Sequence, residues 1–96
     1  MLESAFQRDL IKQLEREFPG CYVIKNDPTY RQGFPDLLVL YKDRWIALEV
    51  KASETSTVQP NQYYYVEQLN EMSGAWFIYP ENKRRVWNEI RKAFSA

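Results

Sequence analysis

Three charged residues lie at the ends of two neighbouring apolar segments of the chain. Asp36 begins the run that continues as Leu37-Leu38-Val39-Leu40, and Glu49 and Lys51 end the run that starts at Trp45. Two carboxylates brought together repel each other unless a cation lies between them, and an all-oxygen site with open water positions suits Mg²⁺, which Mn²⁺ can replace. A lysine beside such a cation can orient a water molecule or neutralise charge in a transition state. These residue types are therefore suited to the hydrolysis of phosphodiesters.

A hairpin between the two segments would bring these charges to one edge of a sheet. With Lys42-Asp43 as its turn, antiparallel pairing places position 36 opposite about position 49. Side chains alternate along a strand, so Glu49 and Lys51 share one face while Val50 points to the other. The backbone carbonyl of Val50 could be a third metal ligand. Glu49-Val50-Lys51 alone is more typical of a solvated strand edge, but its pairing with Asp36 on an adjacent apolar strand favours a functional site.

The elements that must position these residues follow from the periodicity of the apolar side chains. A spacing near 3.6 residues per turn predicts helices over residues 2–18, 59–72 and 83–94. Runs of β-branched and aromatic residues between turn signals predict strands over residues 21–24, 36–41, 44–51 and 75–79. The nearly continuous apolar run at 36–41 predicts a strand buried on both faces. A right-handed crossover through the second helix then gives an α/β fold with a mixed central sheet flanked by helices.

Composition limits both the size of the fold and its chemistry. With 96 residues, the chain is expected to form a single domain, residues 1–96, near the small end of what one hydrophobic core can stabilise. Thirteen Lys and Arg residues balance thirteen Asp and Glu residues, so binding to nucleic acid would depend on local patches. The chain has no histidine, which excludes catalytic triads, His-ligated zinc and a His general base. Carboxylate and lysine chemistry remains.

Cysteine usage and hydropathy bear on the compartment. The single Cys21 cannot form an intrachain disulfide, which fits a reducing environment. The first residues do not resemble a signal peptide, and no stretch approaches the roughly 18 apolar residues of a membrane span. We therefore expect a cytoplasmic protein without a membrane partner.

In combination, these residues resemble the PD-(D/E)XK nuclease superfamily. Pro35-Asp36 matches the first half of its motif and Glu49-Val50-Lys51 the second, and the superfamily core has the same order of helix, three strands, helix and strand. The resemblance covers nearly the whole chain and implies a restriction-endonuclease-like core (αβββαβ) followed by a C-terminal helix. The chain is most similar to standalone VRR-NUC domains, which are typical of phages and bacteria, and next to the archaeal Holliday-junction resolvases. The expected location is then a bacterial or phage-infected host cell.

The resemblance also implies roles for the residues of the candidate site. It implies that Asp36 and Glu49 hold the metal, that Lys51 assists a water molecule, and that Glu3 reaches the site as a further acidic, metal-binding group. Glu3 has a simpler interpretation as a first-turn carboxylate favoured by the helix dipole. Of the four, it depends most on the resemblance alone.

Two polar features belong to the helix predicted at 59–72. Gln62 is similar to the glutamine that family members carry on the helix after the motif. Gln59 is the alternative residue for that motif position, and a surface role is the simpler interpretation of Gln62. Tyr63, Tyr64 and Tyr65 occupy one turn and cannot all face the core, because successive residues are about 100° apart. An exposed tyrosine, Tyr63 in the present assignment, could stack on a base or pack in a dimer, or simply keep its hydroxyl in water.

Basic side chains are the remaining candidates for contacts to DNA. Lys25 and Arg31 belong to the polar loop that leads to Asp36, and Lys83-Arg84-Arg85 open the last helix. A purely solvated surface is the simpler interpretation of both groups.

The expected function is a Mg²⁺-dependent DNA endonuclease that selects branched or Holliday-junction DNA, since no segment resembles a module that reads sequence. Structure selectivity comes from the family analogy alone. Paired cleavage by so small a domain would need two copies, so we expect a homodimer. The alternatives are a site-specific or nicking endonuclease and a non-catalytic nucleic-acid-binding module on a nuclease fold.

Overall fold

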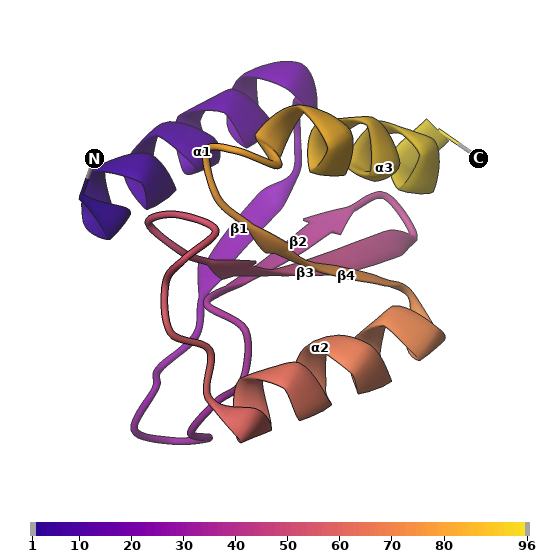
Figure 1. The fold of residues 1–96 in the computed structure, drawn as a ribbon. Helices are drawn as coiled ribbons and strands as arrows, with labels where there is room; N and C mark the ends of the chain where they lie inside the picture. Colours follow the sequence, from indigo (N-terminus) through magenta and orange to yellow (C-terminus); the bar gives the residue numbers. More distant parts are fainter. Residues whose placement is uncertain (1, 96) are drawn as a thin grey trace.

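The computed structural model describes residues 2–95, and Figure 1 shows its arrangement. Over this range the elements are α1 (Glu3–Glu17), β1 (Tyr22–Lys25), β2 (Leu37–Tyr41), β3 (Arg44–Val50), α2 (Pro60–Met72), β4 (Gly74–Ile78) and α3 (Lys83–Ser95). All seven elements predicted from the sequence are confirmed, and no predicted start or end differs from the observed one by more than one residue. None of these helices is long and apolar enough to span a membrane.

The four strands form one mixed sheet in the order β1-β2-β3-β4. β1 pairs with β2 and β2 with β3 in antiparallel orientation, whereas β3 and β4 are parallel and are joined through α2. The β2–β3 register pairs Leu37 with Leu48, so the preceding residue, Asp36, faces Glu49. The predicted α/β fold and the predicted opposition of positions 36 and 49 are both confirmed.

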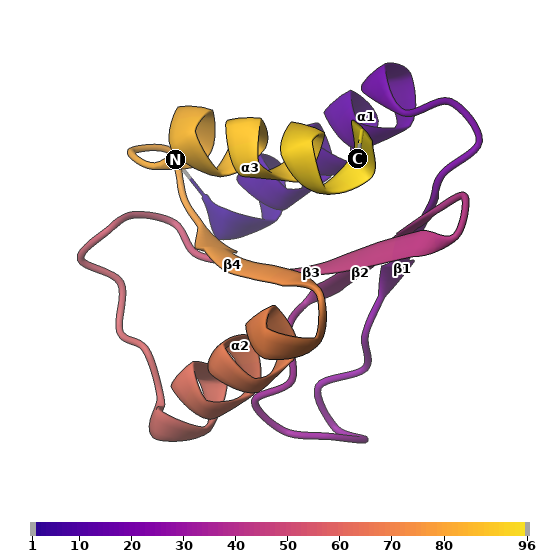
Figure 2. The ribbon, with the colours of Figure 1, turned by 90° about the vertical axis from the view of Figure 1, so that its right-hand side faces the viewer.

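Helices cover the two faces of the sheet unequally. α1 and α3 lie side by side on one face and α2 lies on the other (Figure 2). The larger core lies between the sheet and the α1–α3 layer, with Leu10, Leu14, Val39 and Ile90 among its fully buried members. A smaller cluster under α2 packs Val66 and other side chains on β3 and β4. The sheet is thus sandwiched completely only along β3 and β4.

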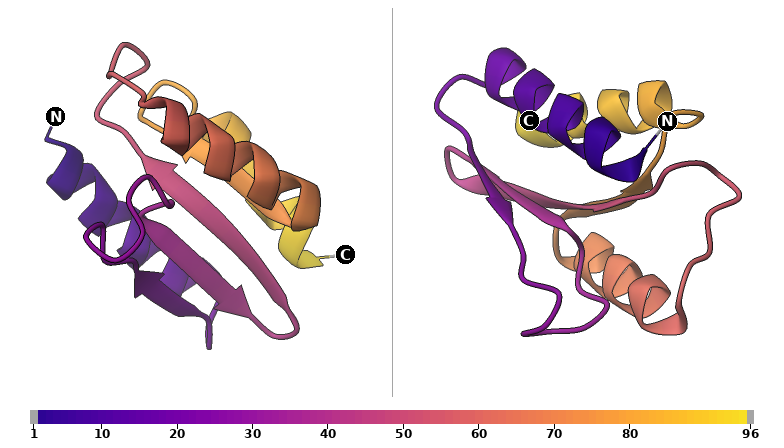
Figure 3. Two further views of the ribbon diagram at one scale, coloured as in Figure 1. Left: turned by 90° about the horizontal axis from the view of Figure 1, so that it is seen from below. Right: turned by 90° about the vertical axis from the view of Figure 1, so that its left-hand side faces the viewer.

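The prediction that the 36–41 strand is buried on both faces is wrong. Leu37 and Val39 are buried against α1 and α3, but Leu40, on the opposite face, is 37% exposed. Tyr22 and Ile24, which lie on β1 beside it, are 69% and 44% exposed. α2 packs on β3 and β4 and leaves the β1–β2 half of this face uncovered, as the left panel of Figure 3 shows.

Candidate functional site

Asp36 and Glu49 meet at the edge of the sheet where β2 begins and β3 ends. Glu49 is only 3% exposed, and the Asp36 carboxylate accepts a hydrogen bond on Oδ2 from the backbone N–H of Val50 at 2.9 Å. Burial, and then the Asp36 charge, raise the pKa of Glu49 to about 8, even though the Lys51 charge lowers it. Two carboxyl groups placed this close are disfavoured as two negative charges, so a proton or a cation would relieve their repulsion.

The backbone around Asp36 leaves one carbonyl available beside the pair. Continuing the β2–β3 register places Pro35 opposite Val50, and proline has no N–H to donate. The Val50 N–H binds the Asp36 side chain, while the Pro35 carbonyl accepts from Asn26 Nδ2 at 2.6 Å. The Val50 carbonyl therefore has no main-chain donor in β2, and its role as a metal ligand stays a prediction.

Lys51 is buried beside Glu49 and is held by α2. Its Nζ lies 3.8 Å from Glu49 Oε2 and donates to Gln62 Oε1 at 2.9 Å and to the Thr57 carbonyl at 3.0 Å. Gln62 Nε2 donates to Glu49 Oε2 at 3.1 Å. One amide thus contacts both the carboxylate and the ammonium group, and it fixes their relative position.

The start of α2 explains why Gln62 points to this site. Pro60 begins the helix, and the Gln62 side chain bonds back to the backbone of Gln59, the residue that caps the helix, as in a capping box. Gln62 Oε1 accepts from the Gln59 N–H at 2.9 Å as well as from Lys51. Of the two glutamines considered from the sequence, Gln62 contacts the charged groups and Gln59 caps the helix.

Glu3, at the first residue of α1, affects the site through its charge. That charge is the weakest of the influences that raise the pKa of Glu49. Within residues 2–95, no three Asp, Glu, Cys or His side chains are close enough together to hold a metal. The structure thus brings together two carboxylates and the Val50 carbonyl, and direct ligation by Glu3 stays a prediction.

The loop that leads to Asp36 carries the first group of DNA-contact candidates. Gly33 adopts φ +87°, and a Cβ there would overlap the Asn61 side chain, so glycine lets the loop pack closely against the start of α2. Arg31 is exposed and lines a hollow of about 470 Å³ with Tyr30 and Phe34. Lys25 is exposed at the end of β1. Both predicted cations are accessible and lie on the segment that ends at Asp36.

Tyr63 lies near Lys51 and lines the same hollow. It is 58% exposed, as predicted for at least one tyrosine of this turn, and its ring packs edge-on against Phe77 with centroids 5.4 Å apart. Together with Lys51 and Tyr79 it lines a hollow of about 230 Å³. Sequence reasoning missed Tyr79, although its position directly after β4, the parallel neighbour of β3, could have indicated it.

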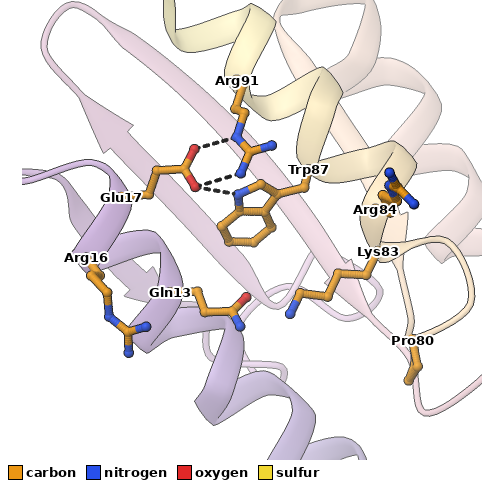
Figure 4. A pocket seen from close by; sticks show the side chains of 8 residues that line it. All are labelled: Gln13, Arg16, Glu17, Pro80, Lys83, Arg84, Trp87 and Arg91. Atoms are coloured by element: carbon orange, nitrogen blue, oxygen red, sulfur yellow. Dashed lines mark hydrogen bonds and ion pairs between the residues drawn. The ribbon is translucent and has the colours of Figure 1, made fainter.

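The basic run that opens α3 does not form one patch. Lys83 and Arg84 line a groove against α1, which Figure 4 shows, whereas Arg85 lines a separate hollow with Tyr63 and Tyr79. Successive helix residues are about 100° apart, so three consecutive side chains cannot share one face. One basic group of three residues is predicted from the sequence, whereas in the structure Arg85 lies apart from Lys83 and Arg84.

Comparison with family models, curated proteins and solved structures gives no match for the chain. The function is therefore inferred from the residues and their geometry. The strongest geometric feature is the group of Asp36, Glu49, Lys51 and Gln62, in which Glu49 and Lys51 are buried. Asp36 directly precedes β2, Glu49 and Lys51 lie at the end of β3, and Gln62 lies in the first turn of α2.

Proposed function

We propose that the protein is a metal-dependent DNA endonuclease of the PD-(D/E)XK type, closest to VRR-NUC domains or Holliday-junction resolvases. The observation that carries the proposal is that Glu49 lies buried between Asp36, Lys51 and Gln62. Burying two carboxylates together is costly unless a cation or proton is shared between them. A fold retains such a group where it has a chemical use, and strongly perturbed pKa values are concentrated at functional sites.

The donor atoms fit a hard divalent cation. Asp36 and Glu49 each have one oxygen that bonds a protein N–H, from Val50 and Gln62 respectively, so each has another oxygen to offer. The Val50 carbonyl adds a third oxygen, and water would complete the six oxygens that Mg²⁺ prefers. When bound, Mg²⁺ or Mn²⁺ would polarise a phosphoryl oxygen and lower the pKa of a coordinated water.

Lys51 and Gln62 contribute to the proposed site as hydrogen-bond donors. The Lys51 ammonium has three N–H groups, two of which bond Gln62 and Thr57. The third is available to orient a water molecule or to stabilise the charge that develops on the phosphoryl oxygens. Gln62 is a positioning residue, because it holds Lys51 and Glu49 at a fixed separation.

The substrate we propose is DNA with a branch or junction, contacted by Lys25, Arg31 and Tyr63 around the site and by Lys83, Arg84 and Arg85 beyond it. The test is cleavage of a labelled four-way junction and a matched linear duplex, each with Mg²⁺, Mn²⁺ or EDTA. Metal-dependent paired nicks in the junction alone support the structure-selective enzyme. Cleavage of the duplex at one fixed sequence supports the site-specific or nicking alternative. Tight binding without cleavage under either metal supports the non-catalytic alternative.

Paired nicks require two sites, and we include a homodimer in the proposal. The uncovered sheet face around Tyr22, Ile24 and Leu40 is an apolar surface that a second copy could cover. Light scattering at micromolar concentration should give twice the mass of the chain, and Tyr22→Glu should return it to the monomeric mass. A monomeric mass for the wild-type protein would contradict the dimer.

A further inference from the structure

A groove between α1 and α3 concentrates positive charge away from the Asp36–Glu49 pair. It has a volume of about 710 Å³ and four cations line it: Arg16 from α1, and Lys83, Arg84 and Arg91 from α3. The chain as a whole has a net charge of zero. Among the described residues that line the groove, Glu17 is the one acidic side chain, so the four cations and this carboxylate give a local net charge of +3.

Glu17 does not oppose an anion in this groove, because its charge is already neutralised. Its carboxylate accepts hydrogen bonds from Arg91 Nε at 2.6 Å, from Arg91 Nη2 at 3.0 Å and from the Trp87 indole N–H at 2.9 Å. The bond from Arg91 is the main cause of the lowered pKa of Glu17. These contacts also fix the end of α1 to α3, so the groove has a rigid wall (Figure 4).

The other three cations have no such partner. Within residues 2–95, Arg16, Lys83 and Arg84 have no acidic group within 4.0 Å. Lys83 Nζ lies 5.7 Å from the centroid of the Trp87 ring, and Figure 4 shows Lys83 and Gln13 extending from α3 and α1 into the same space. The groove therefore presents three uncompensated positive charges and an amide over an apolar floor.

The groove also adjoins the candidate catalytic site. The backbone N–H of Lys51 donates to the carbonyl of Ile78 at 2.9 Å. Pro80, two residues after Ile78, lines the groove. Two residues span at most roughly 7 Å. The end of the groove at Pro80 therefore lies within roughly 7 Å of Ile78, the residue whose carbonyl pairs with the backbone of Lys51.

We propose that the α1–α3 groove binds the phosphodiester backbone of the DNA segment that flanks the cleaved bond. Arg16, Lys83 and Arg84 contact successive phosphates, and Gln13 donates an amide hydrogen bond. Phosphate contacts of this kind fix the position of a duplex and carry no sequence information. The inference rests on the proposed function, because it takes DNA as the substrate.

The test is DNA binding by the full chain, measured by fluorescence anisotropy in EDTA, where cleavage cannot interfere, over a range of salt concentrations. The groove variant is Arg16→Gln with Lys83→Gln and Arg84→Gln. The control variant is Arg8→Gln with Lys42→Gln and Lys92→Gln, which removes three exposed cations that do not line the groove. Both variants change the net charge equally.

We expect the groove variant to lose roughly tenfold or more in affinity, and the slope of log K against log salt to fall by about 0.9 for each phosphate contact removed. The control variant should bind as the wild-type protein does. Equal losses in both variants, or no loss in either, would overturn the proposal. The single variant Arg84→Gln changes only an exposed side chain, so it is the mildest form of the test. The slope of log K against log salt should fall in this variant by about the value of one phosphate contact.

Failure of this inference is distinguishable from failure of the proposed function. If the wild-type protein cleaves DNA and the groove variant binds it as tightly, the inference alone is wrong. If the groove variant loses binding but no form of the protein cleaves, the groove stands and the catalytic function is wrong. A wild-type protein that binds no DNA contradicts both.

Discussion

Gln62 and Glu49 are joined by a hydrogen bond of 3.1 Å, and the same amide accepts from Lys51 on its other atom. Because Gln62 also closes the capping box of α2, the beginning of that helix is tied to the end of β3. A single side chain therefore couples the position of a helix to the geometry of a buried charge pair.

This arrangement predicts the effect of Gln62→Ala. Loss of the cap should lower the free energy of unfolding by about 1 kcal/mol. Turnover should fall about ten- to a hundredfold, since the partners that orient a catalytic group contribute that much in comparable sites. Urea unfolding and single-turnover cleavage measure the two effects. Gln68→Ala, on the same helix, should change neither, and an equal loss of turnover in that variant would contradict the assigned role.

Lys51→Ala should separate binding from catalysis. The change removes the ammonium that faces the carboxylates, so cleavage should fall by about 10²- to 10³-fold. DNA affinity and metal affinity should stay close to those of the wild-type protein, as judged by anisotropy and calorimetry. Lys42→Ala, which removes an exposed lysine of the β2–β3 turn, is the control. A Lys51 variant that no longer binds DNA would show that the residue contacts substrate for binding rather than for turnover.

Mg²⁺ should stabilise the folded protein through the same carboxylates. A ligand that binds only the folded state at a hundred times its dissociation constant adds about 2.7 kcal/mol, which corresponds to a rise of roughly 11–22 °C in Tm for a domain of this size. The rise should be absent in Asp36→Ala and unchanged in Glu54→Ala, whose carboxylate is exposed. Equal stabilisation of all three proteins would place the bound metal elsewhere.

The ion pair of Glu17 and Arg91 predicts a pH dependence of stability. The folded state lowers the pKa of Glu17 below its ordinary value of 4.5, chiefly through the hydrogen bond from Arg91. Its contribution is therefore fully present above about pH 4.5 and is lost as the pH falls through the lowered pKa. Because the pair is partly exposed, we expect up to about 1 kcal/mol.

The check is the difference in Tm between the wild-type protein and Glu17→Gln as a function of pH. The wild-type protein should be the more stable at pH 7, and the difference should shrink as the solution is acidified below pH 4.5. A difference that is constant from pH 7 to pH 3 would show that the contribution comes from packing rather than from charge.

The opposition of Asp36 and Glu49 could be predicted from the sequence because it depends on local information. The short Lys42-Asp43 turn sets the register of the hairpin, and a change of one residue would turn every side chain to the other face. Pro60 likewise marks the start of the helix that carries Gln62, but the choice of Gln62 over Gln59 came from the family resemblance. The elements thus follow from turns and caps that neighbouring residues specify, whereas the contact of Gln62 with Glu49 and Lys51 does not.

Other features depend on packing between distant segments and could not be predicted. The open face at Leu40 results from the placement of α2 over β3 and β4 rather than over the whole sheet. The groove at Arg16 exists because α1 and α3, which are distant in sequence, lie side by side, and no local pattern links Arg16 with Lys83. Periodicity shows which face of a helix is buried, but not which neighbour it meets.

The most direct test of the central claim is cleavage of a four-way junction with Mg²⁺ by the wild-type protein, Asp36→Ala and Glu49→Ala, with Asp43→Ala and Glu54→Ala as controls that remove exposed carboxylates. We predict metal-dependent cleavage by the wild-type protein and both controls, and a loss of at least about a hundredfold in Asp36→Ala and Glu49→Ala. Cleavage that survives in either of these two variants would contradict the assignment of the buried carboxylate pair as the catalytic site.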